Sequence, residues 1–246
     1  MQKSPHLSRV DIVWAAGSGG FSSKTLELKP EFCAFETVLT LSQKLYELFP
    51  QKKACFHLIS SAGGIFEGQR FVNSNSMPMP IRPYGELKLA EEEYLSKSLY
   101  GLYDLLIYRP SSVYGLSIIG NRKGLISTLL HCAERGQVAQ IFGGQDTLRD
   151  FVYVDDIGRF VVDRLFDSAI TNSTYMLVSG KSTAMIEVIN FVEYIVSKKL
   201  YLQFWPVSSN ALDNSYSQAV LPGSWSPIDI RTGIAKTYMQ TKMYIN

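Results

Sequence analysis

Short apolar runs alternate with amphipathic stretches through the first half of this chain, and that alternation constrains the fold more than any other feature of the sequence. Residues 10–16 (VDIVWAA), 54–59 (ACFHLI) and 105–108 (LLIY) have strand length and are followed by glycine, serine or proline. Between them, residues 34–48 and 84–99 carry apolar side chains at the spacing of one helix face. Strands without polar alternation are typical of parallel sheets covered on both faces. The sequence therefore predicts an α/β fold with a doubly wound parallel sheet.

A second group of elements follows Gly115. The pattern predicts helices over residues 124–135 and 155–166 and from Ser182 or Thr183 onward, with strands over 138–142 and 175–178. Asp155 or Asp156 is placed to cap the second of these helices. The last part of the chain carries few periodic signals. We expect two lobes, residues 1–115 and 116–246, with some elements of the second returning to the first.

Composition excludes several classes of function. The chain has 24 Lys and Arg against 22 Asp and Glu, a net charge of +2, so it lacks the basic patch expected for nucleic acid or an anionic membrane. No apolar run reaches the roughly 18 residues that span a bilayer. Its 3 cysteines are widely spaced, which supports neither a disulfide framework nor a zinc site and favours a reducing, cytoplasmic location.

Tyr84 and Lys88 are the most informative pair of residues. They stand four positions apart at the start of the helix predicted over 84–99, so they lie on one face about one turn apart. A free tyrosine has a pKa of about 10, and a nearby ammonium favours its phenolate form. The pair suits removal of a proton from a sugar hydroxyl. Two polar side chains on a solvated helix face would have the same spacing.

Two further polar segments are expected beside this pair. Ser60 and Ser61 close the strand over 54–59, and residues 109–115 (RPSSVYG) follow the strand over 105–108. The carboxyl ends of parallel strands meet at one edge of a sheet, where doubly wound folds bind their ligands. We therefore expect both segments to converge with Tyr84 on one crevice.

Together these segments resemble the extended short-chain dehydrogenase/reductase family, and within it the NAD-dependent nucleotide-sugar epimerases and dehydratases such as UDP-glucose 4-epimerase. The matching motifs follow the family's order: VDIVWAAG (10–17), SSAGGIF (60–66), PYGELK (83–88), RPSSVYG (109–115), GGQDTLRDFVYVDD (143–156), and WSP (225–227) followed by Gly233-Ile234. The resemblance implies an incomplete Rossmann-like, dinucleotide-binding domain over residues 1–115. A smaller α/β lobe over 116–246 would then bind the substrate.

The resemblance assigns the chemistry to three residues. Tyr84 would be the acid/base, Lys88 would hold the nicotinamide ribose and lower the pKa of Tyr84, and Ser61 would border the reacting hydroxyl. NAD is the implied cofactor, taking up hydride from the substrate and returning it. Besides Tyr84 and Lys88, the residues expected at the cofactor are Ala15, Ala16, Gly17, Ser60, Pro110 and Val113. No metal ligand set is expected.

A nucleoside-diphosphate sugar is the implied substrate. Arg149 would pair with its diphosphate, a role that suits a guanidinium fork, or else pair with a neighbouring aspartate at the surface. Tyr175 would pack at the nucleotide site or fill the core. Ser112 is also expected at the substrate, although it replaces the asparagine that the family usually has before V-Y-G.

The chain departs from the family pattern in two places. A dinucleotide fold opens with a strand and a G-x-x-G-x-x-G turn, whose helix binds the pyrophosphate, and no such turn precedes residues 10–16. We expect this departure to weaken NAD binding. In addition, Ala62, Gly63 and Gly64 stand where the family usually places a catalytic serine or threonine. Either Ser61 serves in its place or the polar role is lost.

The first departure also leaves the strand over Val10–Ala16 at an edge of the sheet. An apolar edge with unpaired amides pairs readily with another chain. We therefore expect a homo-oligomer, or association with a partner segment, through this strand.

These features favour an epimerase modestly over a dehydratase. Dehydratases of this family commonly carry an Asp-Glu pair after the serine segment, and Glu67 stands alone there. The alternative is a catalytically impaired remnant, or a subunit that binds a sugar nucleotide but cannot hold NAD alone.

Overall fold

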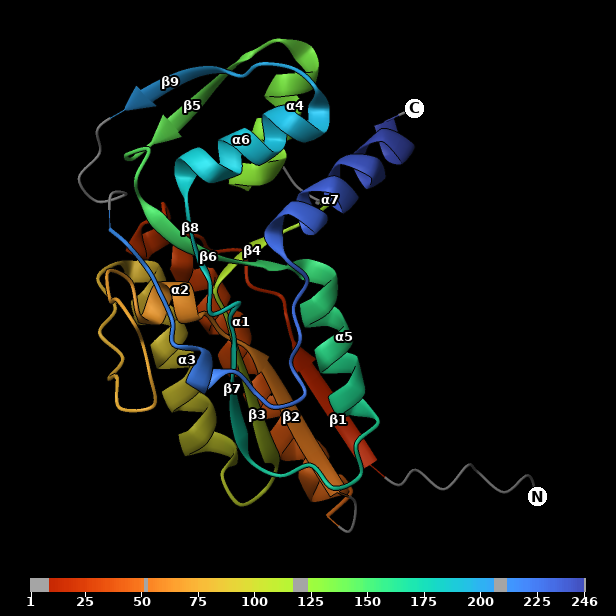
Figure 1. Ribbon diagram of the computed structural model, residues 1–246. Coiled ribbons are helices and arrows are strands. Elements are labelled where there is room, and N and C mark those ends of the chain that lie inside the picture. The colour runs from red at the N-terminus through yellow and green to blue at the C-terminus, as the bar shows by residue number, and fades with distance from the viewer. Residues whose placement is uncertain (1–8, 51–52, 117–123, 206–211, 246) are drawn as a thin grey trace. The chain divides into compact units, whose positions relative to one another are not determined.

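The computed structural model describes residues 9–50, 53–116, 124–205 and 212–245, and the chain forms two compact units (Figure 1). The first unit comprises residues 1–66, 77–109 and 162–176. The second comprises residues 67–76, 110–161 and 177–246. Each unit is therefore assembled from segments that are separated in the sequence.

Four strands form the sheet of the first unit, in the order β1-β2-β3-β7. They are β1 (Arg9–Trp14), β2 (Lys53–Ile59), β3 (Asp104–Pro110) and β7 (Ser173–Leu177). β1 runs parallel to β2 and β2 parallel to β3, which confirms the predicted parallel sheet. Among the described strands β1 has only β2 as a neighbour, so β1 forms an edge of this sheet.

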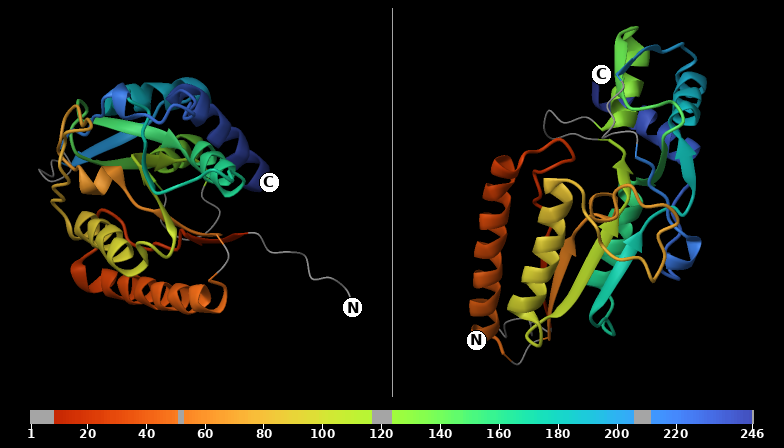
Figure 2. Two further views of the ribbon diagram at one scale, coloured as in Figure 1. Left: turned by 90° about the horizontal axis from the view of Figure 1, so that it is seen from below. Right: turned by 90° about the vertical axis from the view of Figure 1, so that its left-hand side faces the viewer.

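Two long helices, α1 (Thr25–Leu48) and α3 (Pro83–Leu99), lie side by side on one face of the sheet (Figures 1 and 2). Their apolar side chains, such as Phe35 and Leu95, are buried against strand residues such as Phe56. α1 begins at Thr25 and not at residue 34 as predicted, because the helix continues through Pro30. Glu27 stabilises the early start by accepting a hydrogen bond from the Lys24 backbone N–H at 3.1 Å.

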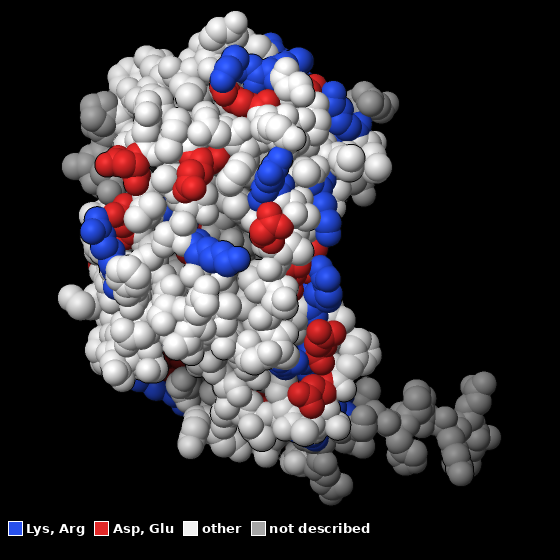
Figure 3. All heavy atoms as spheres, viewed as in Figure 1, with Lys and Arg blue, Asp and Glu red and all other residues white. Residues whose placement is uncertain are grey.

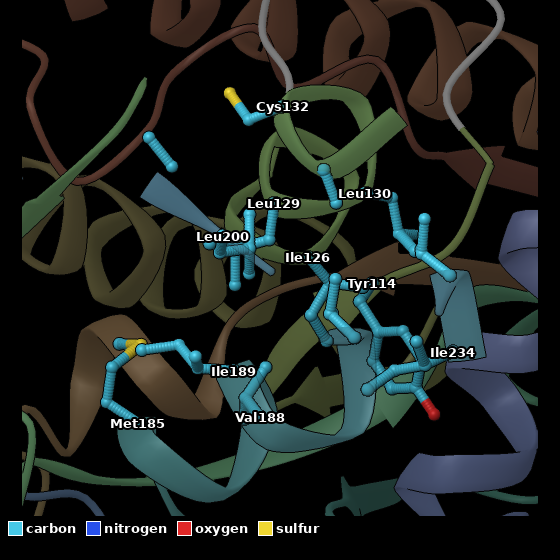
Figure 4. Close-up of a cluster of buried hydrophobic side chains, with 14 of the residues drawn as sticks. Tyr114, Ile126, Leu129, Leu130, Cys132, Met185, Val188, Ile189, Leu200 and Ile234 are labelled. Atoms are coloured by element: carbon cyan, nitrogen blue, oxygen red, sulfur yellow. The ribbon is translucent and has the colours of Figure 1, made fainter. Parts of the chain in front are cut away.

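The second unit contains two further groups of strands. A three-stranded sheet has the order β4-β6-β8, and a parallel pair joins β5 to β9. These strands are β4 (Ser112–Tyr114), β5 (Val138–Phe142), β6 (Leu148–Tyr153), β8 (Ser182–Ala184) and β9 (Tyr201–Trp205). Its helices are α4 (Leu125–Arg135), most of α5 (Val154–Leu165), α6 (Met185–Val196) and α7 (Ile230–Ile245). Figure 4 shows the core of this unit, where Leu129 of α4 and Val188 and Ile189 of α6 gather near Tyr114 and Ile234.

Two predictions for this part of the chain were wrong in detail. Residues 182–184 form β8, paired antiparallel with β6, and α6 begins only at Met185. Asp155 and Asp156 lie in the first turn of α5 and do not cap it. Asp156 instead accepts a hydrogen bond from the Ile228 backbone N–H at 2.9 Å, a contact that the local sequence does not reveal. The helix α7 had no predicted counterpart.

No helix over the described residues is long and apolar enough to cross a bilayer. Basic and acidic side chains are interspersed on the face drawn in Figure 3. All three cysteines carry free thiols, of which only Cys33 is exposed.

Candidate active site

The first turn of α3 presents the Tyr84–Lys88 pair. Pro83 occupies the start of the helix, where its missing N–H costs no hydrogen bond. The Lys88 Nζ lies 5.8 Å from the centre of the Tyr84 ring. Lys88 is 4% exposed, whereas Tyr84 is half-buried. The helical spacing seen in the sequence therefore brings the two side chains together.

Two glycines allow the short helix α2 (Ala62–Ile65) to approach α3 closely. A Cβ atom added to Gly85 would lie 2.8 Å from the carbonyl carbon of Gly64. A Cβ atom added to Gly64 would in turn lie 3.0 Å from the Tyr84 ring. Only glycine tolerates an approach of backbones this close. The Tyr84 ring consequently packs directly over the turn that follows β2.

Ser61 and Ser60, at the end of β2, have different partners. The Ser61 hydroxyl accepts a hydrogen bond from the Gly64 N–H at 3.0 Å, which caps α2, and Ser61 also acts to lower the pKa of Tyr84. The Ser60 hydroxyl instead donates to Glu92 at 2.5 Å. The site thus brings Ser61, and not Ser60, to the phenol of Tyr84.

Glu92 holds three elements together. Besides the Ser60 hydroxyl it accepts two hydrogen bonds from the Arg109 guanidinium, one of them from Nε at 2.9 Å. Glu92 lies on α3, Ser60 follows β2 and Arg109 belongs to β3. A bidentate arginine–carboxylate pair is directional, so it fixes the relative position of these ends.

Lys88 is bound by two buried carboxylates. Its Nζ donates to Glu31 Oε1 at 2.8 Å and to Glu91 Oε2 at 2.9 Å. Glu91 lies three residues further along α3, whereas Glu31 comes from α1. Because an ammonium has three N–H bonds, these contacts leave one for another partner.

Burial raises the pKa of the Tyr84 phenol above its ordinary value. Lys88 and the Ser61 hydrogen bond act in the opposite direction, and Glu31 and Glu91 add to the increase. Lys88 thus acts on the pKa of Tyr84 in the predicted direction, but burial outweighs it. Tyr84 keeps its proton at neutral pH in this state of the protein.

The charged neighbours of Tyr84 are also shifted. Burial works to lower the pKa of Lys88, but Glu91, Tyr84 and Glu31 outweigh it, so the pKa is raised and the ammonium stays charged. Burial works to raise the pKa of Glu31, but Lys88 and two backbone amides outweigh it, so this pKa is lowered. The pKa of Glu91 is raised, chiefly by burial. Glu31 is therefore the firmly ionised partner of Lys88.

The segment after β1 passes directly beside this ion pair. Ala15, Ala16 and Gly17 are exposed, and a Cβ atom added to Gly17 would lie 3.0 Å from both Glu31 Oε1 and Lys88 Nζ. Further along the segment, the Phe21 ring centre lies 5.5 Å from that of Tyr84. Gly17 therefore lies beside Lys88, and the binding of a cofactor by residues 15–17 stays a prediction.

The remaining predicted site residues are distributed over both units. Pro110, Ser112, Val113 and Arg149 belong to the second unit. In that unit β4 pairs with β6, and Arg149 stands opposite Thr183 in the pairing of β6 with β8. The roles predicted for these four residues at the cofactor and the substrate stay predictions.

Tyr175 lies in the first unit, on β7, away from the carboxylate-bound lysine. Its ring stacks on that of Tyr108 with 5.6 Å between centres, and the Arg164 guanidinium lies 5.5 Å from its ring centre. The Tyr175 ring therefore packs on the sheet through its contact with Tyr108. A role for Tyr175 at the nucleotide stays a prediction.

Several residues of the site were not predicted from the sequence. Glu91 and Glu92 have a local signal, because they lie three and four residues after Lys88 and so share its helix face. Glu31 is 57 positions from Lys88 in the sequence and has no such signal. Phe21 lies in a stretch without periodicity.

Comparisons with known proteins show the family to which the chain belongs. Residues 7–168 match the model of the NAD dependent epimerase/dehydratase family. The chain is 28% identical to a UDP-glucuronate 4-epimerase of Thermodesulfobacterium geofontis over 194 residues, 75% of this chain and 58% of that protein. It is 29% identical to a UDP-glucose 4-epimerase of Mycolicibacterium smegmatis over 190 residues, 72% of this chain and 59% of that protein. The chain thus spans less than two thirds of the length of these relatives.

A solved structure has the same fold. The UDP-glucose 4-epimerase of Thermus thermophilus, in complex with NAD, superimposes with a TM-score of 0.70 at 21% sequence identity. The match covers 96% of this chain and 78% of that one. The resemblance to Rossmann-like epimerase structures is therefore established at the level of the fold.

Proposed function

Because this chain belongs to the NAD-dependent epimerase/dehydratase family, we propose that it is a 4-epimerase of a nucleoside-diphosphate sugar, with Tyr84 as its acid/base. The observation that carries the proposal is the packing of Tyr84 against the turn that Ser61 caps, one helical turn from Lys88, at the end of a parallel strand. The two relatives described above are 4-epimerases of UDP-sugars, which supports this substrate class.

The groups around Lys88 fit the nicotinamide ribose of NAD in part. Lys88 keeps one N–H free of its two carboxylates, and Gly17 presents no side chain where it passes the ion pair. When bound, NAD supplies a carbon that accepts a hydride and returns it. The sequence has no G-x-x-G-x-x-G turn for the pyrophosphate.

Each residue of the pair has a distinct task in this proposal. As the phenolate, Tyr84 receives the proton of the sugar hydroxyl and later returns it, and Ser61 holds the phenol and that hydroxyl in line. Since burial raises the pKa of Tyr84, the positive charge of Lys88 is needed to make the phenolate accessible at all. Lys88 also donates its remaining N–H to a ribose hydroxyl.

The remaining proposed contacts with substrate and cofactor follow from the family motifs. Arg149 pairs with the diphosphate, and Ser112 contacts the sugar. Pro110 and Val113 border the nicotinamide, and Tyr175 packs near the nucleotide. Glu67 is the one acidic residue directly after the serine segment, which favours epimerisation over dehydration.

A direct assay tests this function. The protein is incubated with NAD and UDP-glucose, or with NAD and UDP-glucuronate, and the 4-epimers are separated and quantified. Formation of one epimer supports the proposal. Absence of any epimer, together with calorimetric binding of the sugar nucleotide but not of NAD, would contradict it. That outcome supports a second candidate, a sugar-nucleotide-binding subunit without activity.

We also propose that the chain associates through β1. In the described residues this strand has an unpaired edge, and Val13 on it is 44% exposed. An open parallel edge of this kind pairs with a second copy or with a strand of a partner.

A further inference from the structure

Glu31 takes no part in the proton transfer proposed above, yet its carboxylate is fully engaged. Glu31 Oε2 accepts hydrogen bonds from the backbone N–H groups of Ser18 and Gly19, both at 2.7 Å. Glu31 Oε1 accepts from Lys88 Nζ at 2.8 Å. One carboxylate therefore joins α1, the segment after β1, and α3.

The surroundings of Glu31 form an anion site that the chain itself fills. Two consecutive backbone N–H groups converge on one oxygen, an arrangement that binds anions, and an ammonium binds the other oxygen. The Glu31 side chain is 1% exposed, so solvent screens these contacts very little. The lowered pKa of Glu31 agrees with an ionised carboxylate at this place.

Glu31 also determines where Lys88 can point. Glu91, on the same helix, contacts Lys88 Nζ at 2.9 Å from one side. Glu31 contacts it from α1, and the segment at Gly17 passes over the pair. Without Glu31 the ammonium would keep only Glu91 and would turn toward its own helix.

We infer that Glu31 is a positioning residue of the candidate site, an internal anion that fastens the segment at residues 17–19 to the Lys88 ammonium and so fixes the direction of its remaining N–H. The inference rests on the proposed function, since that N–H would meet the ribose of NAD. Glu31 acts through Lys88 and touches no reacting atom.

Three variants separate this role from simple packing. Glu31→Gln keeps the shape of the side chain and an oxygen for the Ser18 and Gly19 amides, but it loses the charge that holds Lys88. Glu31→Ala loses both contacts. Glu47→Gln is the matched control, because Glu47 is an exposed glutamate of the same helix.

The first measurement reads Lys88 itself. Each variant is treated with an amine-acylating reagent, and labelling of Lys88 is quantified by mass spectrometry against Lys97, an exposed lysine of the same helix. Removing an opposite charge lowers a lysine pKa by about one unit or more, so labelling of Lys88 should rise roughly tenfold in Glu31→Gln and Glu31→Ala. Labelling should not change in Glu47→Gln. Unchanged labelling of Lys88 in both Glu31 variants would overturn the inference.

The second measurement restores the missing anion. Formate is small enough to occupy the space vacated in Glu31→Ala and to accept from the same three donors. We expect formate to restore the protection of Lys88 in Glu31→Ala, and sodium chloride at the same ionic strength to leave it unprotected. Equal effects of both salts would count against a specific anion site.

The third measurement connects the inference to the proposed function. Titration calorimetry with NAD should give an affinity roughly tenfold lower in Glu31→Gln than in the wild type, because the Lys88 N–H that would bind the ribose is no longer held in position. An unchanged affinity would contradict the positioning role. If the wild type binds no NAD, the proposed function fails, and the labelling and formate measurements still decide whether Glu31 positions Lys88.

Discussion

The Cβ position of Gly85 lies 2.8 Å from the carbonyl carbon of Gly64, so the absence of a side chain at residue 85 sets the spacing between α3 and the turn that carries Ser61. Replacing Gly85 with alanine forces this turn away from α3 and disturbs the packing of Tyr84 against it. We expect Gly85→Ala to lower the free energy of unfolding by about 1–3 kcal/mol, the usual cost of overpacking. Urea denaturation measures this loss, and epimer formation should fall with it.

Gly158 provides the control for that substitution. It is an exposed residue of α5, and a Cβ atom added there meets nothing within 4 Å. Gly158→Ala should leave stability unchanged or raise it by about 0.5–1 kcal/mol, because alanine favours the helix. Equal losses in the two variants would show that close helix approach is not the cause.

Removing the hydroxyl of Tyr84 tests the acid/base assignment. Tyr84→Phe keeps the ring over α2 and deletes the group that exchanges the proton. Turnover of the UDP-sugar should fall by roughly 10²–10⁴-fold, the range for loss of a general acid–base group, while sugar-nucleotide binding by calorimetry is retained. Tyr100→Phe, at an exposed tyrosine that ends the same helix, should keep full turnover. Undiminished turnover in Tyr84→Phe would refute the assignment.

Glu92 is expected to be important for stability. Glu92→Ala leaves the Arg109 guanidinium, which is 17% exposed, without its carboxylate partner and frees the Ser60 hydroxyl. Breaking a buried ion pair at one partner costs about 3–5 kcal/mol, which denaturant unfolding resolves easily.

The neighbouring residue Glu93 is the control for Glu92. Its contact with Lys97 measures 3.9 Å between two exposed side chains, so Glu93→Ala should cost at most about 0.5 kcal/mol. A loss in Glu92→Ala no larger than that in Glu93→Ala would disprove the structural role of the Ser60–Glu92–Arg109 cluster.

A buried histidine makes stability depend on pH. His57 of β2 is fully buried, with Nε2 3.0 Å from Asp11 Oδ1 and Nδ1 2.9 Å from the Tyr108 hydroxyl. Burial lowers the pKa of His57, although Asp11 works to raise it. The unfolded chain, with a histidine pKa of about 6.5, therefore binds the proton first. The stabilisation is complete above that pH and is lost as the pH falls through the folded pKa.

This pH effect is measured as a difference between two proteins. Unfolding in urea at pH 7.5 and at pH 5.5 should show a smaller acid loss in His57→Gln than in the wild type. Carboxyl groups that titrate in both proteins contribute equally to both acid losses and cancel in the difference. They include Glu91, whose raised pKa increases stability as the pH falls. Identical acid losses in the two proteins would exclude His57 as the source.

The open edge of β1 predicts concentration-dependent association. Size-exclusion chromatography of the wild type should show a species larger than the monomer. Val13→Lys places a charge on the exposed part of this edge and should shift the protein toward the monomer. Val162→Lys, at a similarly exposed valine of α5, should not. A wild type that elutes as a well-folded monomer at every concentration would contradict the prediction.

The elements that local pattern controls were predicted well from the sequence. β5 occupies Val138–Phe142 as predicted, with alternating exposed and buried residues, and α4 ends at Gly136 in the left-handed conformation that glycine favours. The Tyr84–Lys88 pair is of the same kind, because helical spacing alone brings it together.

Elements determined by distant contacts were not predicted. Residues 182–184 resemble a helix start, but they form a strand because β6 pairs with them. Glu91 and Glu92 fit the polar face of α3, yet they are buried by partners on α3, β2 and β3 that the helix pattern does not contain. Glu31 contacts a residue 57 positions away, and no periodicity carries information over that distance.

The segmented make-up of the two units has a consequence for synthesis on the ribosome. The first unit needs residues 162–176. These are translated after residues 67–76 and 110–161, which belong to the second unit. A nascent chain that stops before Ser173 lacks β7. The edge of β3 that pairs with β7 is then open, and the first unit is incomplete. Domains usually fold in the order of their emergence. Here the residues of the first unit are complete only at position 176, and no single cut of the chain separates the two units.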